Sequence, residues 1–362
     1  MSQIPMLENI SSQPASHRAL LTLHRGSQQA ALRACAELIR KAQGRVIFSG
    51  MGGSLCATLA AVSRLRQQGR LAEASESAEL LHYGSAPLRA GDLGLVISRS
   101  GGSIEPLLLA EKMRNAGMTV IAVTNVPGSQ LEQIADVTLN IGAQPDKMVA
   151  VQTYTGTVLT LLLLAEEVLA GESRKLSDEC ESALPALAEL IEESVQESER
   201  WRDLLVGAPL YLLGRGPALG SVYEGALLVH ETAKAAAVGM SSGQFRHGPA
   251  EILSSDFRAV VFGTPVPTQA LDRSLADDLF SAGAQVRWIG PAPEAGGDHA
   301  PALVSWPAIN SVLAPVFEIV PLQVAAYRLA LWRGVTPGEF RFVTEVTSTE
   351  SGFLASKPIA RG

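Results

Sequence analysis

Residues 93–106 have the sequence LGLVISRSGGSIEP, in which an apolar run ends in a turn of serines and glycines. The run over residues 93–98 is typical of a strand that is buried on both faces. The turn leads directly into a segment with helical character, from about residue 105 to 116. A strand followed by a helix is the unit of parallel α/β folds. This stretch therefore predicts a parallel sheet with the turn at its carboxyl edge.

Working outward, the same alternation of short apolar runs and helical segments continues in both directions. In the first half it predicts strands over residues 45–48, 119–123 and 136–140, and a more exposed strand over 79–83. In the second half it predicts strands over residues 210–213, 259–262, 285–289 and 302–305. The second half therefore repeats the architecture of the first.

Helical patterns surround these two regions. Apolar residues at helical spacing predict an amphipathic helix over residues 16–43, a core helix over 158–170 and a helix over about 314–332. A helical stripe beside a Glu-rich face over residues 176–206 predicts a connecting helical region rather than a flexible linker. We expect the tail after Gly334 to be irregular or docked, because its pattern is weak.

The length of 362 residues favours two domains. We predict an α/β protein with two similar domains, each a parallel sheet flanked by helices. The expected segments are a helical lead-in (1–43), a first domain (44–170), a helical connection (171–207), a second domain (208–335) and a C-terminal tail near the active site (336–362).

Composition excludes several classes of protein. The net charge is −7 and the basic residues are scattered, so we expect no nucleic-acid partner. The most apolar run is interrupted by Thr160, Glu166 and Glu167 and is too short to cross a bilayer, so we expect no membrane partner. The three cysteines lack paired spacing, which predicts neither a disulfide framework nor a zinc site. Without a signal segment at the start, we expect a cytoplasmic protein. We also expect no metal or cofactor, since the sequence contains no cluster of metal-ligating residues.

The turn over residues 98–103 suits a phosphate. Three hydroxyls, two glycines and the N-terminus of a helix meet there, and free N–H groups with a helix dipole favour an anion. The alternative is an ordinary helix cap with turn glycines, since serine commonly precedes a helix for capping alone.

A second glycine-rich turn, Gly50-Met51-Gly52-Gly53-Ser54, follows the first predicted strand. It fails as a dinucleotide fingerprint, because Leu55 occupies the third glycine position and the next strand ends without an acidic residue. We interpret this turn as a close approach of backbone to a sugar. Residues 214–216, Gly-Arg-Gly, form the equivalent turn of the second half.

Two acidic residues and one histidine are candidates for proton transfer. Glu224 and Glu231 are seven residues apart on one predicted helix face, where a carboxylate can be either a general base or a solvated surface group. His247 immediately precedes Gly248-Pro249, which marks a helix start. A helix N-terminus disfavours imidazolium, so His247 is either a neutral proton acceptor or a capping or core residue.

Taken in order, five segments resemble the SIS (sugar isomerase) family, which includes the isomerase half of glucosamine-6-phosphate synthase and stand-alone fructosamine-6-phosphate deglycases. These segments are residues 6–14, 98–103, 124–129, 224–227 and 247–249. The resemblance spans nearly the whole chain and implies a double SIS architecture. Since no glutaminase segment precedes it, ammonia from glutamine is not implied.

The resemblance also implies roles for individual residues. Glu231 matches the proton shuttle between C1 and C2, and His247 matches the ring-opening histidine. Relatives supply this histidine from the neighbouring subunit, so the resemblance implies a homodimer or a higher homo-oligomer. The implied binding residues for a phosphorylated sugar or sugar-amine are Gly53, Ser54, Ser98, Arg99, Ser100, Ser103, Gln152 and Glu345.

Two positions and one segment depart from the family pattern. The synthase has a lysine three residues before the shuttle glutamate, where this chain has Leu228, and its Schiff-base lysine near the C-terminus matches Glu345. Residues 146–153 also differ from the family's Ser-Thr-Lys run. The lost lysines favour a deglycase over a synthase. An aldose–ketose isomerase, an amino-sugar-phosphate deaminase and a non-catalytic phosphosugar sensor remain as alternatives.

Overall fold

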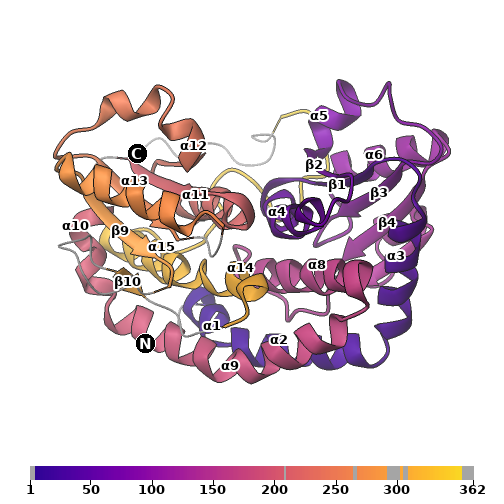
Figure 1. Cartoon of the computed structure of the whole chain (residues 1–362), viewed down its shortest axis with the longest axis horizontal. Helices are drawn as coiled ribbons and strands as arrows, with labels where there is room; N and C mark the ends of the chain where they lie inside the picture. The colour runs from indigo at the N-terminus through magenta and orange to yellow at the C-terminus, as the bar shows by residue number, and fades with distance from the viewer. Residues whose placement is uncertain (1–4, 208, 264–266, 292–301, 305–308, 353–362) are drawn as a thin grey trace.

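The computed structural model describes residues 5–207, 209–263, 267–291, 302–304 and 309–352. Two parallel sheets lie side by side, and each has helices on its faces (Figure 1). The first sheet has five strands in the order β2-β1-β3-β4-β5. Their bounds are β1 Val46–Gly50, β2 Ala72–Glu76, β3 Leu93–Ile97, β4 Thr119–Thr124 and β5 Val137–Asn140.

The second sheet repeats this topology. Its five described strands run in the order β10-β9-β8-β6-β7, with bounds β6 Leu210–Gly214, β7 Ala237–Ser241, β8 Arg258–Phe262, β9 Gln285–Ile289 and β10 Ala302–Val304. Numbered within each domain, both sheets have the order 2-1-3-4-5. In such sheets ligands bind beyond the carboxyl ends of the strands, where the strand order reverses. For the first sheet this place lies beyond β1 and β3.

The helices divide between the lead-in, the two domains and the connection. The lead-in comprises α1 Pro5–Ser11, α2 Gln13–Arg25 and α3 Gln29–Lys41. The first domain contains α4 Gly52–Gln67, α5 Ser77–His82, α6 Ile104–Asn115, α7 Gln130–Ile134 and α8 Gln152–Ala170. The connection contains α9 Ser173–Gln196 and α10 Arg202–Leu205. The second domain contains α11 Leu219–Ala233, α12 Ser242–Phe245, α13 Gln269–Ser281, α14 Ala314–Phe317 and α15 Val320–Trp332.

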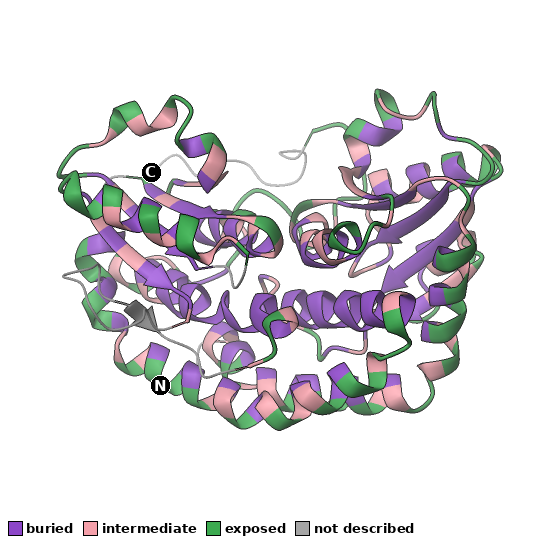
Figure 2. Cartoon of the chain, in the orientation of Figure 1, coloured by how far each residue is buried: buried purple, intermediate pink, exposed green. Residues whose placement is uncertain are grey.

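Alternating side chains of β1 divide between two cores. Ile47 packs with residues of α5, α6 and α7 on one face of the first sheet, whereas Val46 and Phe48 belong to a large core shared with the second domain. Helix α8 lies in this shared core and is buried along most of its length (Figure 2). The shared core holds the two domains together.

Two helical segments are long and apolar enough to cross a membrane by length and composition, residues 152–170 and 311–332. Within each, 89% of the most apolar window is buried inside the protein. The prediction of a core helix over residues 158–170 is therefore confirmed, and these segments are interior helices of the fold.

Four sequence predictions were wrong in detail. Residues 79–83 are not a strand: they fall largely within α5, because Leu80 and Leu81 both pack into the core beneath the sheet, and the edge strand β2 precedes them. Strand β7 was missed. The predicted helix over 16–43 is interrupted at Gly26, whose N–H bonds back to the carbonyls of the preceding turn. The helix over 314–332 is split between α14 and α15, and Ser305 of the predicted strand 302–305 lies outside the described residues.

Candidate active site

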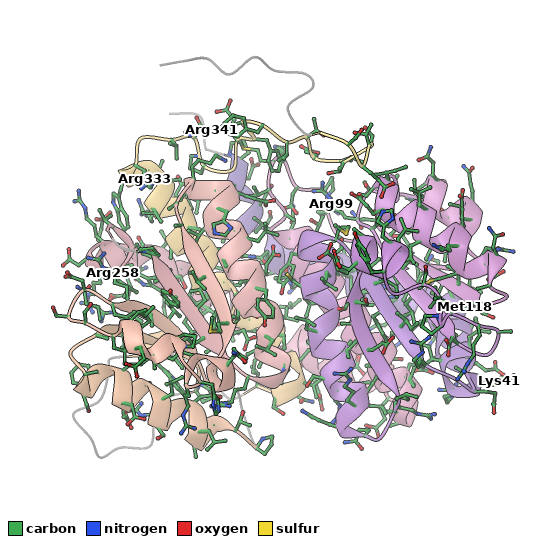
Figure 3. All side chains as sticks on the ribbon, turned by 90° about the horizontal axis from the view of Figure 1, so that it is seen from above. Lys41, Arg99, Met118, Arg258, Arg333 and Arg341 are labelled. Atoms are coloured by element: carbon green, nitrogen blue, oxygen red, sulfur yellow. The ribbon has the colours of Figure 1, made fainter. Side chains whose placement is uncertain are left out.

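A cavity of about 350 Å³ lies where the carboxyl end of the first sheet faces α11 of the second domain. Its walls are the turns after β1 and β3, the start of α8, one face of α11 and the C-terminal segment. It brings together eight of the ten predicted site residues, namely Gly53, Ser54, Ser98, Arg99, Ser100, Ser103, Glu231 and Glu345. Figure 3 shows Arg99 near the middle of the molecule, at the edge of the first domain that faces the second.

The turn over residues 98–103 is held from behind by the loop that follows β4. The carbonyls of Arg99 and Gly101 accept hydrogen bonds from the N–H groups of Asn125 and Leu131, both at 3.0 Å. Gly101 has a φ of +61°, and a Cβ there would lie 2.2 Å from the Ser129 Oγ. Only glycine therefore permits both this backbone conformation and this close contact. The loop fixes the turn as a rigid wall of the cavity.

The hydroxyls of the turn remain available to a ligand. Ser98 Oγ and Ser100 Oγ accept the N–H groups of Gly101 and Gly102, each at 3.2 Å, and neither hydroxyl proton has an acceptor in the described part of the chain. Ser103 occupies the N-cap position of α6 without making a side-chain cap bond. Capping alone therefore does not explain these serines, and three hydroxyls, a helix N-terminus and the Arg99 guanidinium meet in an arrangement that is suited to an anion.

The turn after β1 meets the second domain directly. A Cβ at Gly53 would lie 2.9 Å from one carboxyl oxygen of Glu224, so the glycine leaves room for that carboxyl. Gly52 and Gly216 have φ angles of +50° and +51°, which bears out the predicted equivalence of the two turns.

Glu231 lies near the C-terminal end of α11, and both it and Glu224 line the cavity, as their spacing of seven residues predicts. Burial raises the pKa of the Glu231 carboxyl, while the charges of Lys234 and Arg99 oppose this rise. A carboxyl whose pKa is raised and which lines a cavity is suited to general base catalysis.

Residues 146–153 build the start of α8. Asp146 accepts the N–H groups of Val151, Gln152 and Thr153 at 2.9, 3.1 and 2.9 Å, and thereby caps the helix from outside. The Gln152 side chain donates to the Pro145 carbonyl at 3.2 Å and does not line the cavity. Thr153, Tyr154 and Thr157 line it in place of Gln152, and their polar groups at the start of an apolar helix were a signal that sequence reasoning missed.

The C-terminal segment crosses the mouth of the cavity. The Thr347 carbonyl accepts the N–H of Ile104 at the start of α6, at 3.0 Å, and His82 bonds Glu350 at 2.6 Å. Glu345 lines the cavity with its side chain 54% exposed, and its carboxylate lies 4.0 Å from the Arg99 guanidinium. The described part of the tail, up to residue 352, is therefore docked beside the cavity, which was one of the two predicted alternatives.

His247 lies elsewhere. Its side chain is exposed, two residues before the short 3₁₀ helix Pro249–Ile252, and it does not line the cavity. A single chain therefore does not bring His247 to Glu231.

Cys35, Cys56 and Cys180 are free and buried, and burial raises the pKa of the Cys35 and Cys180 thiols to about 12. Within the residues that the structure describes, no group of His, Cys, Asp or Glu is arranged to hold a metal ion.

Residues 38–166, which contain the turns after β1 and β3, match the family model of the SIS domain. The first domain is an SIS domain. The repeated strand order of the second domain fits a double SIS architecture. In sequence, the chain is 29% identical over 354 residues to the glutamine–fructose-6-phosphate aminotransferase (isomerizing) of Thermococcus kodakarensis. This alignment covers 95% of this chain and 58% of that protein. The chain thus spans somewhat more than half the length of this relative and is homologous to its isomerase domain.

Solved structures share the fold of both SIS-like domains. The C-terminal domain of glucosamine-fructose-6-phosphate aminotransferase from Francisella tularensis has a TM-score of 0.82 at 18% identity, covering 93% of this chain and 98% of that one. Tagatose-6-phosphate ketose/aldose isomerase from Escherichia coli has a TM-score of 0.76 at 23% identity, covering 91% and 93%. These likenesses cover more than nine-tenths of the chain and show that it shares the two-domain fold of these proteins, which fits a double SIS architecture.

Proposed function

We propose that this protein is a phosphosugar deglycase, which hydrolyses a sugar-amine 6-phosphate of the fructosamine 6-phosphate type to an aldose 6-phosphate and an amine. One observation carries the proposal: Glu231 lies in the same cavity as the anion-binding turn, and no lysine lines that cavity among the described residues. The named relatives act on sugar phosphates, which supports the substrate class.

The substrate would bind with its phosphate at the turn over residues 98–103. The hydroxyls, the N-terminus of α6 and the Arg99 guanidinium would neutralise the phosphate charge there. The sugar would then extend along the turn after β1 towards α11, with Ser54 and Gly53 beside it. This orientation directs C1 and C2 towards Glu231.

The chemistry is a proton shuttle followed by hydrolysis. The Glu231 carboxylate removes a proton from C1 of the protonated ketosamine, and the electron pair forms a C1–C2 double bond while charge moves onto O2. The substrate's ammonium gives a proton to O2. Glu231 returns its proton to C2, which leaves an iminium at C1. Water adds to C1, the C–N bond breaks, and the amine leaves as an ammonium ion.

This sequence needs no enzyme lysine. The nitrogen of a ketosamine supplies the electron-withdrawing centre that a Schiff base with lysine would otherwise provide. Leu228 is buried at the position where the synthase carries one lysine, and Glu345 stands at the position of the other. The lining of the cavity is therefore compatible with a deglycase and unfavourable for a Schiff-base route.

We propose that His247 acts in the cavity of a second subunit. Its exposure and its distance from the cavity of its own chain support a homodimer or a higher homo-oligomer in which the histidine is shared. An imidazole at the sugar ring would open it to the free carbonyl form. Free, buried thiols also fit the cytoplasm, which we propose as its location.

An aldose–ketose isomerase is the second candidate, because it would use the same proton transfer and the fold is shared with such an isomerase. An amino-sugar-phosphate deaminase would likewise need Glu231 and differs in the amine that it releases. A phosphosugar sensor would bind the ligand without using Glu231.

Release of amine from 6-phosphorylated ketosamines tests the proposal. We expect E231Q to lower kcat by roughly 10²–10⁴-fold with little change in KM. The matched control is E166Q, since Glu166 is a buried glutamate that pairs with Arg64 and does not line the cavity. Unchanged activity in E231Q contradicts the proposal. Deuterium incorporation into fructose 6-phosphate without an amine favours the isomerase, and tight binding without turnover favours the sensor.

A further inference from the structure

Glu224 is a buried acidic side chain of the cavity that the proposed proton shuttle does not use. It lines the cavity and is only 3% exposed. Its Oε2 atom has no hydrogen-bond partner among the described residues. A buried carboxyl oxygen without a partner is costly, so it calls for an explanation at a site where a ligand binds.

No cation faces this carboxyl among the groups described around it. The titratable groups that interact with it are Cys56 on α4, Tyr154 on α8, Asp146 before α8 and Glu231 on its own helix. All of these are acids. Leu228, one turn further along α11, is buried where a cation would stabilise a carboxylate.

The two carboxyls of α11 that line the cavity, Glu224 and Glu231, therefore differ in their surroundings. The positive charges of Lys234 and Arg99 favour the ionised form of Glu231, so Glu231 ionises more readily than Glu224. Burial, together with the charges of Glu231 and Asp146, raises the pKa of Glu224 well above its usual range. Two carboxyls with such different environments commonly divide the roles of base and acid between them.

We propose that Glu224 is a further catalytic residue, a neutral carboxylic acid that donates a hydrogen bond from the cavity wall to the substrate oxygen at C2. This proposal rests on the proposed function. As Glu231 removes the proton from C1, negative charge develops on O2, and a preorganised donor stabilises that charge. A carboxylate at the same place would repel it. Glu224 keeps its proton throughout, so the proton balance of the reaction is unchanged.

The carboxyl of Glu224 lies against Gly53. Because a Cβ at this position would lie 2.9 and 3.3 Å from the two carboxyl oxygens, the glycine and the carboxyl are closely fitted to each other. Gly53 also belongs to the turn along which the sugar would lie. The Glu224 carboxyl on α11 therefore lies against the turn along which the sugar would bind.

The test compares E224Q with E224L. Glutamine keeps a neutral N–H donor of nearly the same shape, whereas leucine keeps only the volume. We expect E224Q to retain kcat within about tenfold and E224L to lose roughly 10²–10³-fold, with KM for the phosphosugar little changed in both. The matched control is E318Q, because Glu318 is 1% exposed but accepts the Ser221 hydroxyl at 2.6 Å outside the cavity; it should leave kcat unchanged.

The pH dependence supplies a second readout. Ionisation of Glu224 should reduce the rate of the unsubstituted enzyme at alkaline pH, and E224Q should lose this decline. Equal rates in E224Q and E224L, with both folded and both binding substrate, overturn the proposal. So does a wild-type rate in E224L.

A binding experiment separates this inference from the proposed function. A 5-phosphorylated hydroxamate that mimics the enediolate should bind E224Q like the unsubstituted protein and E224L at least tenfold more weakly, an amount of about 1.4 kcal/mol. If no sugar-amine phosphate is turned over but this order of affinities holds, the deglycase proposal fails and the role of Glu224 stands. Equal affinity for all three proteins contradicts that role.

Discussion

Substitution of Gly101 by alanine is a sharp test of the phosphate-binding turn, because the structure supplies its own control. Gly101 has a φ of +61°, whereas Gly128 has a φ of +75° and a Cβ added there would have no atom within 4 Å. G128A therefore changes only the backbone preference. G101A would in addition place its Cβ 2.2 Å from the Ser129 Oγ and 2.9 Å from the Thr124 Oγ1.

The expected magnitudes follow from these contacts. A left-handed conformation costs an L-residue about 1–2 kcal/mol, which applies to both variants. Ser129 caps α7 by accepting the N–H of Glu132 at 3.4 Å, and losing a cap costs about 1 kcal/mol more. We therefore expect the free energy of unfolding to fall by about 1–2 kcal/mol in G128A and by about 2–3 kcal/mol in G101A.

Function should separate the two variants more clearly than stability. Movement of the turn in G101A displaces the serine hydroxyls, so KM for a phosphorylated substrate should rise about tenfold or more. In G128A, KM should stay unchanged. Chemical unfolding and steady-state kinetics on both proteins measure these effects. If G101A behaves like G128A in both assays, the turn is not the phosphate site that the contacts indicate.

Three further predictions concern other parts of the chain. If His247 is shared between the subunits of a dimer, mixing H247A with E231Q subunits should restore up to about a quarter of the activity of the unsubstituted dimer. No recovery of activity would contradict a shared histidine. Burial lowers the pKa of His17 from 6.5 to about 4. Because the unfolded chain binds the proton first, we expect the free energy of unfolding to fall by about 3 kcal/mol between pH 6.5 and pH 4. Acid unfolding that the H17F substitution leaves unchanged would refute this. E345A should lower kcat/KM by no more than about fivefold, since an exposed ion pair 4.0 Å from Arg99 contributes little; a larger loss would give Glu345 a direct role.

The sequence was sufficient to predict the sheets, because their strands are short apolar runs between turns. The β1 and β3 strands and their turns were predicted closely, since buried parallel strands have a continuous apolar pattern. Strand β7 lacked that signal: four of its five residues are only half-buried and two of them are Gly239 and Ser241. Edge strands of this kind are recognised only by their pairing.

The site was predicted unevenly for a related reason. The six predicted site residues in the turns after β1 and β3 are local in sequence, and all six line the cavity. Tyr154 and Thr157 could not be found in this way, because they depend on how α8 is rotated beneath the first sheet. Gln152 stands directly before Thr153, yet its side chain turns to Pro145, away from the cavity. Such differences are set by packing and not by local pattern.

The most direct test of the proposed reaction is to run it in D₂O and analyse the sugar product. A shuttle through Glu231 converts the ketosamine to an aldose 6-phosphate, with deuterium incorporated at C2 whenever the carboxyl exchanges with solvent before it returns its proton. Release of the amine together with such an aldose product is the predicted result. Release of the amine with a ketose 6-phosphate that carries no deuterium on carbon would show displacement at C1 without a proton shuttle, and would contradict the account.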